Sequence, residues 1–537
     1  MRPAPLPAPA PPPAFHMISA RMAATPPVVL DGSPLTPAQV EAVARHHATV
    51  ELAPAARQRV ADCRRALEAH LAGGTVVYGV NTGFGSLSRV RVDTAQLADL
   101  QANLVRSHAS GTGEPAADEV VRGMMLLLAA SLARAHSGVR PELVEQIVGM
   151  INGGVTPVVP SRGSVGASGD LAPLAHVALV LLGEGEARHH GKLVSGGAAL
   201  AAAGLKPFTL AAREGLALIN GTHYMASVAS LAVRDMRALL HTAVRATALS
   251  IDACRATDSF LDPRIHQARN QPGQQRVAAA ILAQLAGSQI LLAHKEDDPR
   301  VQDPYSFRCT PQVLGAVADA LAHVQRVVQH ELGGVTDNPL VFPDGHATDI
   351  LSGGNFHGMP LAISMDLAKI ALAHLAGISE RRVFWILAAT DPQNPVRAYL
   401  SPQPGLHSGY MIAQYAAAAC CNELQTLAHP ASVGNVSTSA GIEDYNSMGA
   451  TSANHLRMSV DRALETVAIE LLVMCEGLEY QRPLQSGSGV EGLFRSVRAE
   501  VPRLVQDRPP APDIARLAAQ IRYGAFCSAD ADTLLRT

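Results

Sequence analysis

Aromatic residues are scarce in this chain of 537 residues. They make up 4% of it, with a single tryptophan, although hydrophobic residues make up 48%. A core of alanine, leucine and valine favours close-packed helices, so the composition predicts an α-rich protein. An excess of charge of either sign is also missing, because the formal net charge is −3. The chain therefore lacks the basic surface that would indicate a nucleic-acid partner, and we expect none.

The cysteines lack any C-x-x-C spacing. They number seven, and an odd number without paired spacing argues against a disulfide framework or a structural zinc site. We therefore expect a reducing compartment and a cytoplasmic location. Adjacent histidines at 46–47 and 189–190 have no carboxylate or cysteine partner at ligand spacing, so we interpret them as solvated surface residues and predict no metal.

Long uninterrupted apolar runs are missing as well. The least charged stretch, residues 215–233, contains Asn220, Gly221, Thr222 and His223, which favours a buried helix over a membrane span. Residues 1–30 are rich in proline and alanine without a continuous apolar segment, so we predict a disordered tail and no signal peptide. We expect no membrane partner.

Helical periodicity dominates the chain after residue 120. Apolar residues recur at helical spacing over 121–135, 142–152, 211–255, 274–294, 311–333, 359–390, 410–427 and 452–478. Earlier helices are predicted from Pro37, over 54–71, and from Leu100 up to a glycine stop at Gly111. No repeat of 20 to 50 residues is visible, so a solenoid is excluded. We predict a smaller N-terminal head over 31–120 and a long helical bundle over 121–537.

The segment 163–176, Gly-Ser-Val-Gly-Ala-Ser-Gly-Asp-Leu-Ala-Pro-Leu-Ala-His, has two interpretations. The first is a loop entering a helix, with Asp170 near the N-cap and Pro173 in the first turn. The second is backbone chemistry. If the amide nitrogen of Gly169 attacks the carbonyl carbon of Ala167 and water leaves, a five-membered imidazolone ring forms, and loss of the Ser168 hydroxyl leaves an exocyclic methylidene. Glycine suits the attacking position because it lacks Cβ.

The product would be 4-methylidene-imidazol-5-one (MIO), an electrophile that no ordinary side chain supplies. The whole segment resembles the prosthetic-group segment of the aromatic amino acid ammonia-lyases, and most of all that of the histidine lyases among them. The resemblance implies an MIO group made from Ala167, Ser168 and Gly169 without an external cofactor. It also implies a mainly α-helical subunit of the fumarase/aspartase-like architecture, which assembles as a homotetramer.

Two segments of the predicted head carry further resemblance. Residues 76–85 read Val-Val-Tyr-Gly-Val-Asn-Thr-Gly-Phe-Gly, which taken alone is a turn-rich loop with a tyrosine anchor. They are similar to the tyrosine loop of the family, which implies that Tyr78 is the catalytic base. Ser107 and His108 end the helix predicted before Gly111. Taken alone, such a histidine is a cap or a core residue, but histidine lyases have Ser-His at the corresponding place.

Four later segments resemble family motifs in family order. They are 218–222, 301–309, 353–358 and 438–445, and the resemblance as a whole spans residues 31–530. Each motif alone could be a cap, a surface ion pair, a loop anchor or an acidic turn. Together they imply a substrate-binding set consisting of His108, Asn220, Gln302, Tyr305, Arg308 and Phe356.

The roles that the resemblance implies follow the chemistry of ammonia elimination. Tyr78 would remove a β-proton of low acidity, which requires a phenol pKa lowered from about 10. Arg308 can bind the substrate carboxylate with two parallel hydrogen bonds. Asn220, Gln302 and Tyr305 would supply hydrogen bonds around the amine, the carboxylate and the prosthetic ring, and Phe356 would lie beside that ring. Whether the substrate amine or its aromatic ring adds to the methylidene stays open.

Glu443 and His108 indicate the substrate. A carboxylate beside the substrate side chain needs a donor or a cation, which an imidazole supplies and a phenyl ring does not. Phenylalanine and tyrosine lyases usually have glutamine where Glu443 falls. We therefore predict a carbon–nitrogen lyase of histidine catabolism that converts L-histidine to trans-urocanate, with Glu443 placed in its catalytic set.

Other functions remain open at this point. Residues 394–400 lack the Leu-Pro-Pro-Phe-Leu stretch usual in histidine lyases, and His223-Tyr224 stands where glutamine and small residues are more typical. These departures leave tyrosine, phenylalanine or a modified histidine as alternative substrates. An MIO aminomutase is a second alternative. An inactive scaffold is a third, although its expected sign, loss of Tyr78, Ser168 or Arg308, is not found.

Overall fold

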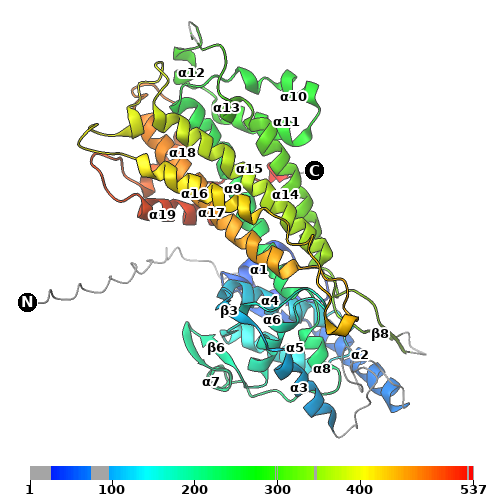
Figure 1. The fold of residues 1–537 in the computed structure, drawn as a ribbon. Coiled ribbons are helices and arrows are strands. Elements are labelled where there is room, and N and C mark those ends of the chain that lie inside the picture. The colour runs from blue at the N-terminus through cyan, green and yellow to red at the C-terminus, as the bar shows by residue number, and fades with distance from the viewer. Residues whose placement is uncertain are drawn as a thin grey trace, which may run out of the picture.

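The computed structural model describes residues 26–73, 96–296, 298, 300–343, 348–528 and 531–535. Most of the predicted tail and the whole loop with Tyr78 lie outside the described residues, so both interpretations stay predictions. Within the described residues the protein is mainly α-helical, as predicted, with a long helical bundle above a smaller lower part (Figure 1). The proposed domain boundary at residue 120 stays a prediction.

The lower part combines short helices with small sheets (Figure 1). Its helices are α1 (Pro37–Ala44), α2 (Pro54–Ala72), α3 (Leu97–His108), α4 (Asp118–Leu132), α5 (Pro141–Asn152), α6 (Leu171–Leu181), α7 (Gly196–Ala202) and α8 (Glu214–Ile219). The parallel pair is β1 (Val28–Leu30) with β2 (Val50–Leu52). The antiparallel sheets are β3 (Thr112–Pro115) with β5 (Pro160–Arg162), β4 (Val155–Pro157) with β6 (Glu186–His189) and β7 (Lys192–Ser195), and β8 (Leu340–Pro343) with β9 (Thr348–Leu351).

The bundle is built from long helices that lie side by side (Figure 1). They are α9 (His223–Ala253), α14 (Thr310–Glu331), α15 (Met359–Ala388), α16 (Met411–Leu427) and α17 (Gly449–Glu479), accompanied by α18 (Ser488–Glu500) and α19 (Ala511–Arg522). The far end of the bundle carries α10 (Pro263–Arg269), α11 (Pro272–Gln284), α12 (Gln289–Ala293) and α13 (Tyr305–Arg308).

The structure divides two of the predicted helices and moves one helix end. The segment 211–255 breaks at residues 220–222 because Gly221 has a φ of +116°. The segment 274–294 breaks where Gly287 has a φ of +80° and Ser288 caps α12. The predicted stop at Gly111 is wrong, since α3 already ends at His108. Gly111 instead donates its N–H to Nε2 of His176 on α6, 3.2 Å away.

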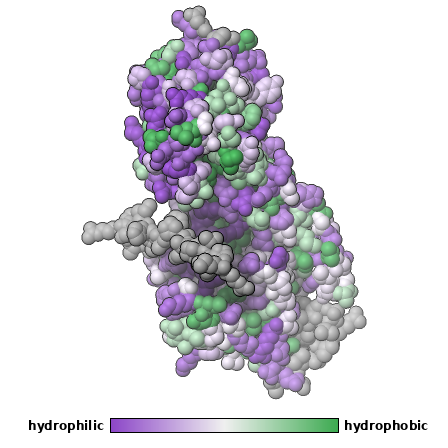
Figure 2. Space-filling model, turned by 60° about the vertical axis from the view of Figure 1, so that its left-hand side comes forward, coloured by the Kyte–Doolittle hydropathy of each residue, from purple (hydrophilic) through white to green (hydrophobic). Residues whose placement is uncertain are grey.

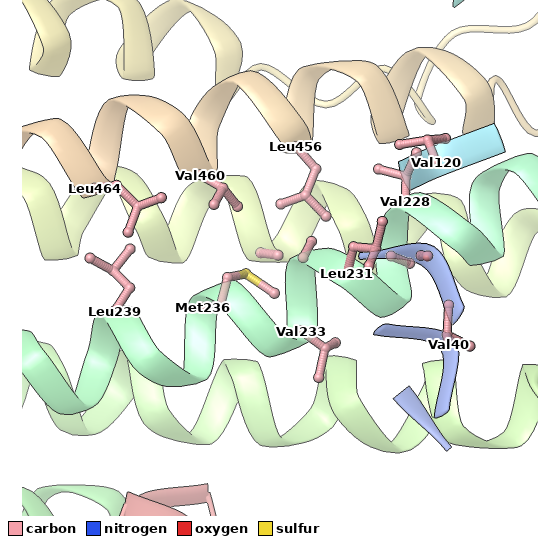
Figure 3. Packing of buried hydrophobic residues seen from close by; sticks show 14 of the residues in the cluster. Val40, Val120, Val228, Leu231, Val233, Met236, Leu239, Leu456, Val460 and Leu464 are labelled. Carbon is pink, nitrogen blue, oxygen red and sulfur yellow. The ribbon is translucent and has the colours of Figure 1, made fainter. Parts of the chain in front are cut away.

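The core between α9 and α17 explains the helical spacing of their apolar residues. Leu456, Val460 and Leu464 follow one face of α17 at intervals of four and point toward α9 (Figure 3). The labelled residues of both helices increase in the same direction, so the two helices run parallel. Leu239 of α9 lies opposite Leu464, and both are buried. This packing fixes the beginnings of α9 and α17 at the same end of the bundle.

One helix within the described ranges, α15, is long and apolar enough to cross a membrane. It packs against α9, α14, α16 and α17, and 61% of its most apolar stretch is buried. The central helix of a protein core has the same length and composition. Its packing is that of a bundle helix.

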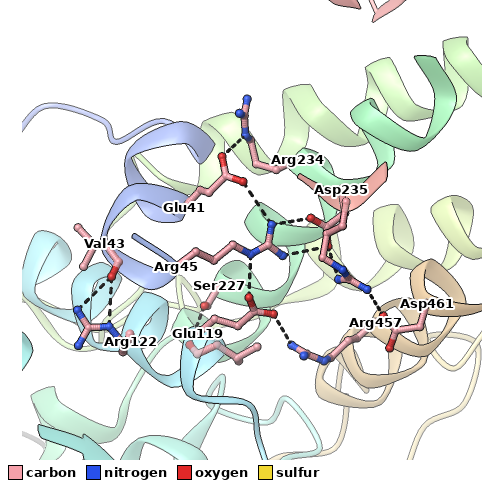
Figure 4. Close-up of polar contacts among 12 residues, drawn as sticks. Glu41, Val43, Arg45, Glu119, Arg122, Ser227, Arg234, Asp235, Arg457 and Asp461 are labelled. Carbon is pink, nitrogen blue, oxygen red and sulfur yellow. Dashed lines mark hydrogen bonds and ion pairs between the residues drawn. The ribbon is translucent and has the colours of Figure 1, made fainter. Parts of the chain in front are cut away.

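A buried ion network joins the lower part to the bundle (Figure 4). Arg45, the C-cap residue of α1, donates to Asp235 of α9 over 2.6 Å and to Glu119 of α4 over 2.7 Å. Arg522 of α19 donates to the other oxygen of Asp235, and Arg457 of α17 to the other oxygen of Glu119. Burial acts to lower the pKa of Arg45, but Asp235 and Glu119 outweigh it and raise that pKa. The network therefore joins five helices through ion pairs.

We expect Arg45→Met to destabilise the protein by about 3 kcal/mol or more, because it leaves the buried carboxylate of Asp235 and the half-buried carboxylate of Glu119 each short of a cation. Arg234→Met is the matched control: the Arg234 side chain is 31% exposed and pairs with Glu41, so its loss should cost less than about 1 kcal/mol. Urea unfolding of both variants measures the difference. Equal effects would contradict the assigned importance of Arg45.

Candidate active site

The beginnings of three helices meet around residues 163–170. Asp170 directly precedes α6, and its Oδ2 accepts the backbone N–H groups of Tyr224 and Met225 in the first turn of α9, at 2.9 and 3.0 Å. The carbonyl of Val165 accepts the N–H of Met448, which directly precedes α17. Helix N-termini carry partial positive charge. The segment therefore lies where negative charge that develops during a reaction is stabilised.

Two opposing effects act on the pKa of the Asp170 carboxyl. Its side chain is fully buried, and burial is the main cause that raises the pKa of its carboxyl from the ordinary 3.8 to about 7. The hydrogen bonds from Met225 and Tyr224 act in the opposite direction, as does the hydroxyl of Ser164. The carboxyl is thus anchored at the N-terminus of α9, with a pKa near neutral pH.

The backbone of Ser168 and Gly169 lies directly against Gly221. The Gly221 N–H donates to the Ser168 carbonyl at 3.2 Å, and the Asp170 N–H donates to the Gly221 carbonyl at 2.7 Å. Gly169 has a φ of +77°, and a Cβ there would lie 2.1 Å from the Gly221 oxygen. Only glycine fits this position. At Gly169 no side chain obstructs ring closure in the tripeptide Ala167-Ser168-Gly169, so these residues fit the MIO group.

A cavity of about 890 Å³ opens beside this backbone. Its lining residues come from α3, α6, α8 and the loops that precede α15 and α17. Six residues selected from sequence line it together: His108, Ala167, Ser168, Asn220, Phe356 and Glu443. A concave site with a few convergent polar groups among apolar ones is typical of a small-molecule pocket.

Glu443 lies across the cavity wall from the serine. Its Oε1 accepts from the Ser168 hydroxyl over 3.5 Å, a weak hydrogen bond, and its Oε2 accepts from the Thr438 hydroxyl over 2.9 Å. The Thr438 N–H also donates to the Glu443 carbonyl, so the loop closes on itself and holds the carboxylate in place. One oxygen of Glu443 thus remains weakly engaged and can accept from a ligand.

His108 and Asn220 each keep one acceptor without a partner among the described residues. Nδ1 of His108 is 2.9 Å from the Leu104 carbonyl, which can only accept, so Nδ1 carries the proton and Nε2 is the acceptor. Asn220 donates through its amide to Asp337 at 3.2 Å and to the Asn338 carbonyl at 2.9 Å, while its Oδ1 accepts from none of the described residues. Asp337 in turn pairs with buried Arg213 over 2.6 Å.

Gln302, Tyr305 and Arg308 do not line this cavity. Arg308 belongs to α13, where its guanidinium lies 4.5 Å from the ring centre of Tyr305. Tyr305 is 69% exposed. The adjoining Asp303 accepts from the N–H of Thr257, just beyond the C-terminus of α9. Since α9 has 31 residues, it separates these three residues from Asp170 at its N-terminus by about 45 Å.

The predicted base, Tyr78, is not among the described residues, so its place in the site stays a prediction.

Sequence reasoning missed several groups that the fold brings to the site. His357 and Asp444 line the cavity, although both stand inside motifs already quoted. The remaining two are Asn338, another lining residue, and Asp337, which orients Asn220. A cluster of polar residues at 336–338 before Pro339 was the available signal, since it predicts a turn.

Comparisons with known proteins identify the class of this fold and site. The family model described as aromatic amino acid lyase matches residues 35–499. A histidine ammonia-lyase from Deinococcus radiodurans is 48% identical over 486 residues, which cover 90% of this chain and 92% of that protein. The fold and the matched family are those of a carbon–nitrogen lyase.

Solved structures agree with this assignment. The crystal structure of histidine ammonia-lyase from Trypanosoma cruzi superposes with a TM-score of 0.86 at 38% identity and covers 95% of this chain and 98% of that one. Tyrosine aminomutase from Streptomyces globisporus gives 0.86 at 35% identity, over 93% and 97% of the two chains. The chain belongs to the aromatic amino acid lyase family.

The raised pKa of Asp170 predicts a pH-dependent stability difference. Between about pH 4 and pH 7 the folded state keeps the proton that the unfolded state releases, so the wild-type protein loses stability as pH rises through this range. Asp170→Asn cannot ionise and keeps an acceptor for the α9 N–H groups. Its melting temperature should therefore rise relative to wild type from pH 4 to pH 7.

Asp349→Asn, at an exposed position of β9, is the control and should show a nearly constant difference from wild type. A melting-temperature difference for Asp170→Asn that also stays constant across this range would contradict the raised pKa.

Proposed function

We propose that this protein eliminates ammonia from L-histidine and releases trans-urocanate. The observation that carries the proposal is the presence of Ser168, Glu443 and His108 in one cavity. The first is the residue from which the electrophile would form, and the other two match an imidazole. The high identity to proteins named histidine ammonia-lyase supports the same substrate.

Ala167, Ser168 and Gly169 are proposed to form MIO by cyclisation and loss of two waters. Gly221 would hold this segment through the Ser168 carbonyl and the Asp170 N–H. The group supplies the electrophile that turns the substrate's amine into a better leaving group. The converging N-termini of α6, α9 and α17 favour negative charge at this place. Phe356 lines the same cavity and provides an apolar wall.

The chain's own side chains supply binding and proton transfer in this proposal. Tyr78 removes the β-proton, which requires a phenol pKa lowered toward neutral pH. Arg308 binds the substrate carboxylate with its planar guanidinium, and Gln302 and Tyr305 orient the amine and the carboxylate. Asn220 offers its unpartnered Oδ1 to the polar end of the substrate.

An aminomutase remains the second candidate, because the structural relatives include a tyrosine aminomutase. It would share the electrophile and return ammonia to the β-carbon. Detection of a β-amino acid among the products distinguishes it from a lyase.

The substrate proposal predicts that the wild-type protein produces urocanate from histidine, measured by its ultraviolet absorbance. Glu443→Gln should lower kcat/KM for histidine by about ten- to a hundredfold, because a hydrogen bond to a charged group contributes about 1.5–3 kcal/mol. Asp444→Asn, which changes the neighbouring carboxylate, should have a smaller effect.

Two further measurements complete this test. The intact mass of the wild-type subunit should be lower than that of its sequence by two waters, and Ser168→Ala should retain the full mass. Turnover of tyrosine or phenylalanine without turnover of histidine would refute histidine as the substrate. The assignment to the class of ammonia-lyases would stand.

We propose a homotetramer in which each active site draws on more than one subunit. The separation of Arg308 from Glu443 along α9 supports this, since one chain does not bring the binding set together. Large apolar side chains are exposed on the bundle at Ile363, Phe384, Ile412 and Tyr415, although the face seen in Figure 2 is largely hydrophilic with small hydrophobic patches. Assembly would cover such residues.

Shared sites predict complementation between two impaired variants. Arg308→Met and Glu443→Gln subunits, coexpressed and purified as mixed tetramers, should regain activity, because about a quarter of randomly assembled sites combine both wild-type residues from different chains. If both residues served one site from the same chain, mixed tetramers would stay as inactive as either variant. Each variant expressed alone is the control.

A cytoplasmic location is proposed on the state of the cysteines. All seven lie within the described residues, and none forms a disulfide. Thiols that stay reduced are typical of the cytosol.

A further inference from the structure

A second polar cluster lies on the other side of the turn at residues 220–222. It surrounds a cavity of about 10 Å³ between the end of α4, the beginning of α9 and the end of α14. Its polar lining consists of Ser131, Arg134, Thr222, His223, Glu331 and Thr336, and it shares no residue with the large cavity. The cluster is therefore a separate site directly behind the active-site backbone.

Several buried polar atoms of this cluster lack a partner among the described residues. His223 is 5% exposed, and neither of its ring nitrogens is hydrogen-bonded; the same holds for Nε of Arg134. The other guanidinium nitrogens of Arg134 donate to the carbonyls of Gly334 and Leu332. A buried polar atom without a partner destabilises a fold, so three such atoms around one small cavity indicate a bound polar molecule.

The size and the chemistry of the cavity match one water molecule. A volume of about 10 Å³ corresponds to a single water, which needs two to four polar partners. Burial, with the nearby charge of Arg134, lowers the pKa of His223 to about 3, so the ring is neutral and offers one acceptor nitrogen. A water can accept from Nε of Arg134 and donate both to His223 and to the carboxylate of Glu331.

We propose that Arg134, His223 and Glu331 hold one buried water molecule, and that His223 thereby acts as a positioning residue for the backbone of Ser168 and Gly169. The positioning role rests on the proposed MIO chemistry, whereas the hydration site does not. Nothing in the reaction touches His223 itself. Its effect passes through Gly221.

The contacts of Gly221 carry this effect. A Cβ on Gly221 would lie 2.5 Å from Cε1 of His223 and 2.6 Å from Oγ1 of Thr336, so the imidazole and the threonine confine the turn from behind. The Thr222 N–H donates to Thr336 over 3.3 Å, and the Thr222 hydroxyl donates to Glu331. From the front, Gly221 holds the Ser168 carbonyl and the Asp170 N–H. A shift of the imidazole therefore moves the segment that must cyclise.

The test compares His223→Leu with His223→Gln. Leucine keeps much of the volume and offers no polar atom to the water, so the fraction of subunits lighter by two waters should fall, and kcat should drop by about tenfold or more with KM changed less than about twofold. Glutamine can both donate and accept, and it should restore kcat to within about threefold of wild type. The matched control is His241→Leu, a buried histidine of the same helix, which should lower the melting temperature and leave mass and kcat unchanged.

A crystal structure of the wild-type protein tests the hydration site directly. Density for one water within hydrogen-bond distance of Arg134 Nε and a ring nitrogen of His223 is expected. A dry cavity, or a direct contact between His223 and Glu331, would overturn the site. A His223→Leu protein with wild-type mass and kcat would overturn the positioning role, as would a His223→Gln protein no better than His223→Leu.

The hydration site and the positioning role of His223 can be refuted separately. A wild-type subunit of unmodified mass that turns over no aromatic amino acid would overturn the proposed function and with it the positioning role. The crystal structure would still show whether the cavity holds a water molecule. If His223→Leu does not fold, His223→Met, which is also apolar, takes its place in the comparison of mass and kcat with His223→Gln.

Discussion

The carboxyl group of Asp170 ties the first turn of α6 to the first turn of α9. Two hydrogen bonds from helix N–H groups to an ionised carboxylate contribute about 1.5–3 kcal/mol each, and the helix N-terminus adds about 0.3–1 kcal/mol. Against this, full burial of a charge costs several kcal/mol. The burial cost exceeds these gains, which agrees with a pKa raised from 3.8 to about 7. The carboxyl anchors the Ser168 segment in either protonation state, because its oxygen accepts from the helix in both.

The rigidity of this anchor comes from the bundle behind it. Parallel packing of α9 and α17 (Figure 3) brings the beginnings of both helices to one end, where they contact residues 163–170. The network around Arg45 and Asp235 fixes α9 to α1 and α4 (Figure 4). The same long helices carry Arg308 away to the opposite end. A fold that holds the Ser168 segment so firmly therefore separates it from Arg308, its predicted carboxylate binder, within one chain, and the proposed homotetramer would bring the two together from different chains.

Much of this organisation follows from local patterns in the sequence. Apolar spacing located the bundle helices, and Pro37 at the first helical position located α1. The breaks at Gly221 and Gly287 were missed, because apolar periodicity continues across them. Six of the residues selected from sequence line one cavity. They could be predicted because their motifs carry strong local signals. Asp170 was interpreted as an N-cap of its own helix, yet its side chain serves α9, more than fifty positions away. Such a partner is set by tertiary packing and leaves no spacing in the sequence.

The choice of histidine under the proposed function depends on how many acceptors face the substrate ring. Glu443 alone distinguishes an imidazole from a phenyl ring, because a phenyl ring leaves the carboxylate without a donor. It does not by itself reject tyrosine, whose hydroxyl also donates. His108 changes this count: its Nδ1 is committed to the Leu104 carbonyl, so the cavity presents Nε2 as a second acceptor. A protonated imidazole has two N–H donors and a phenol has one. Two acceptors in one cavity therefore favour histidine in its charged form and leave one acceptor unsatisfied with tyrosine.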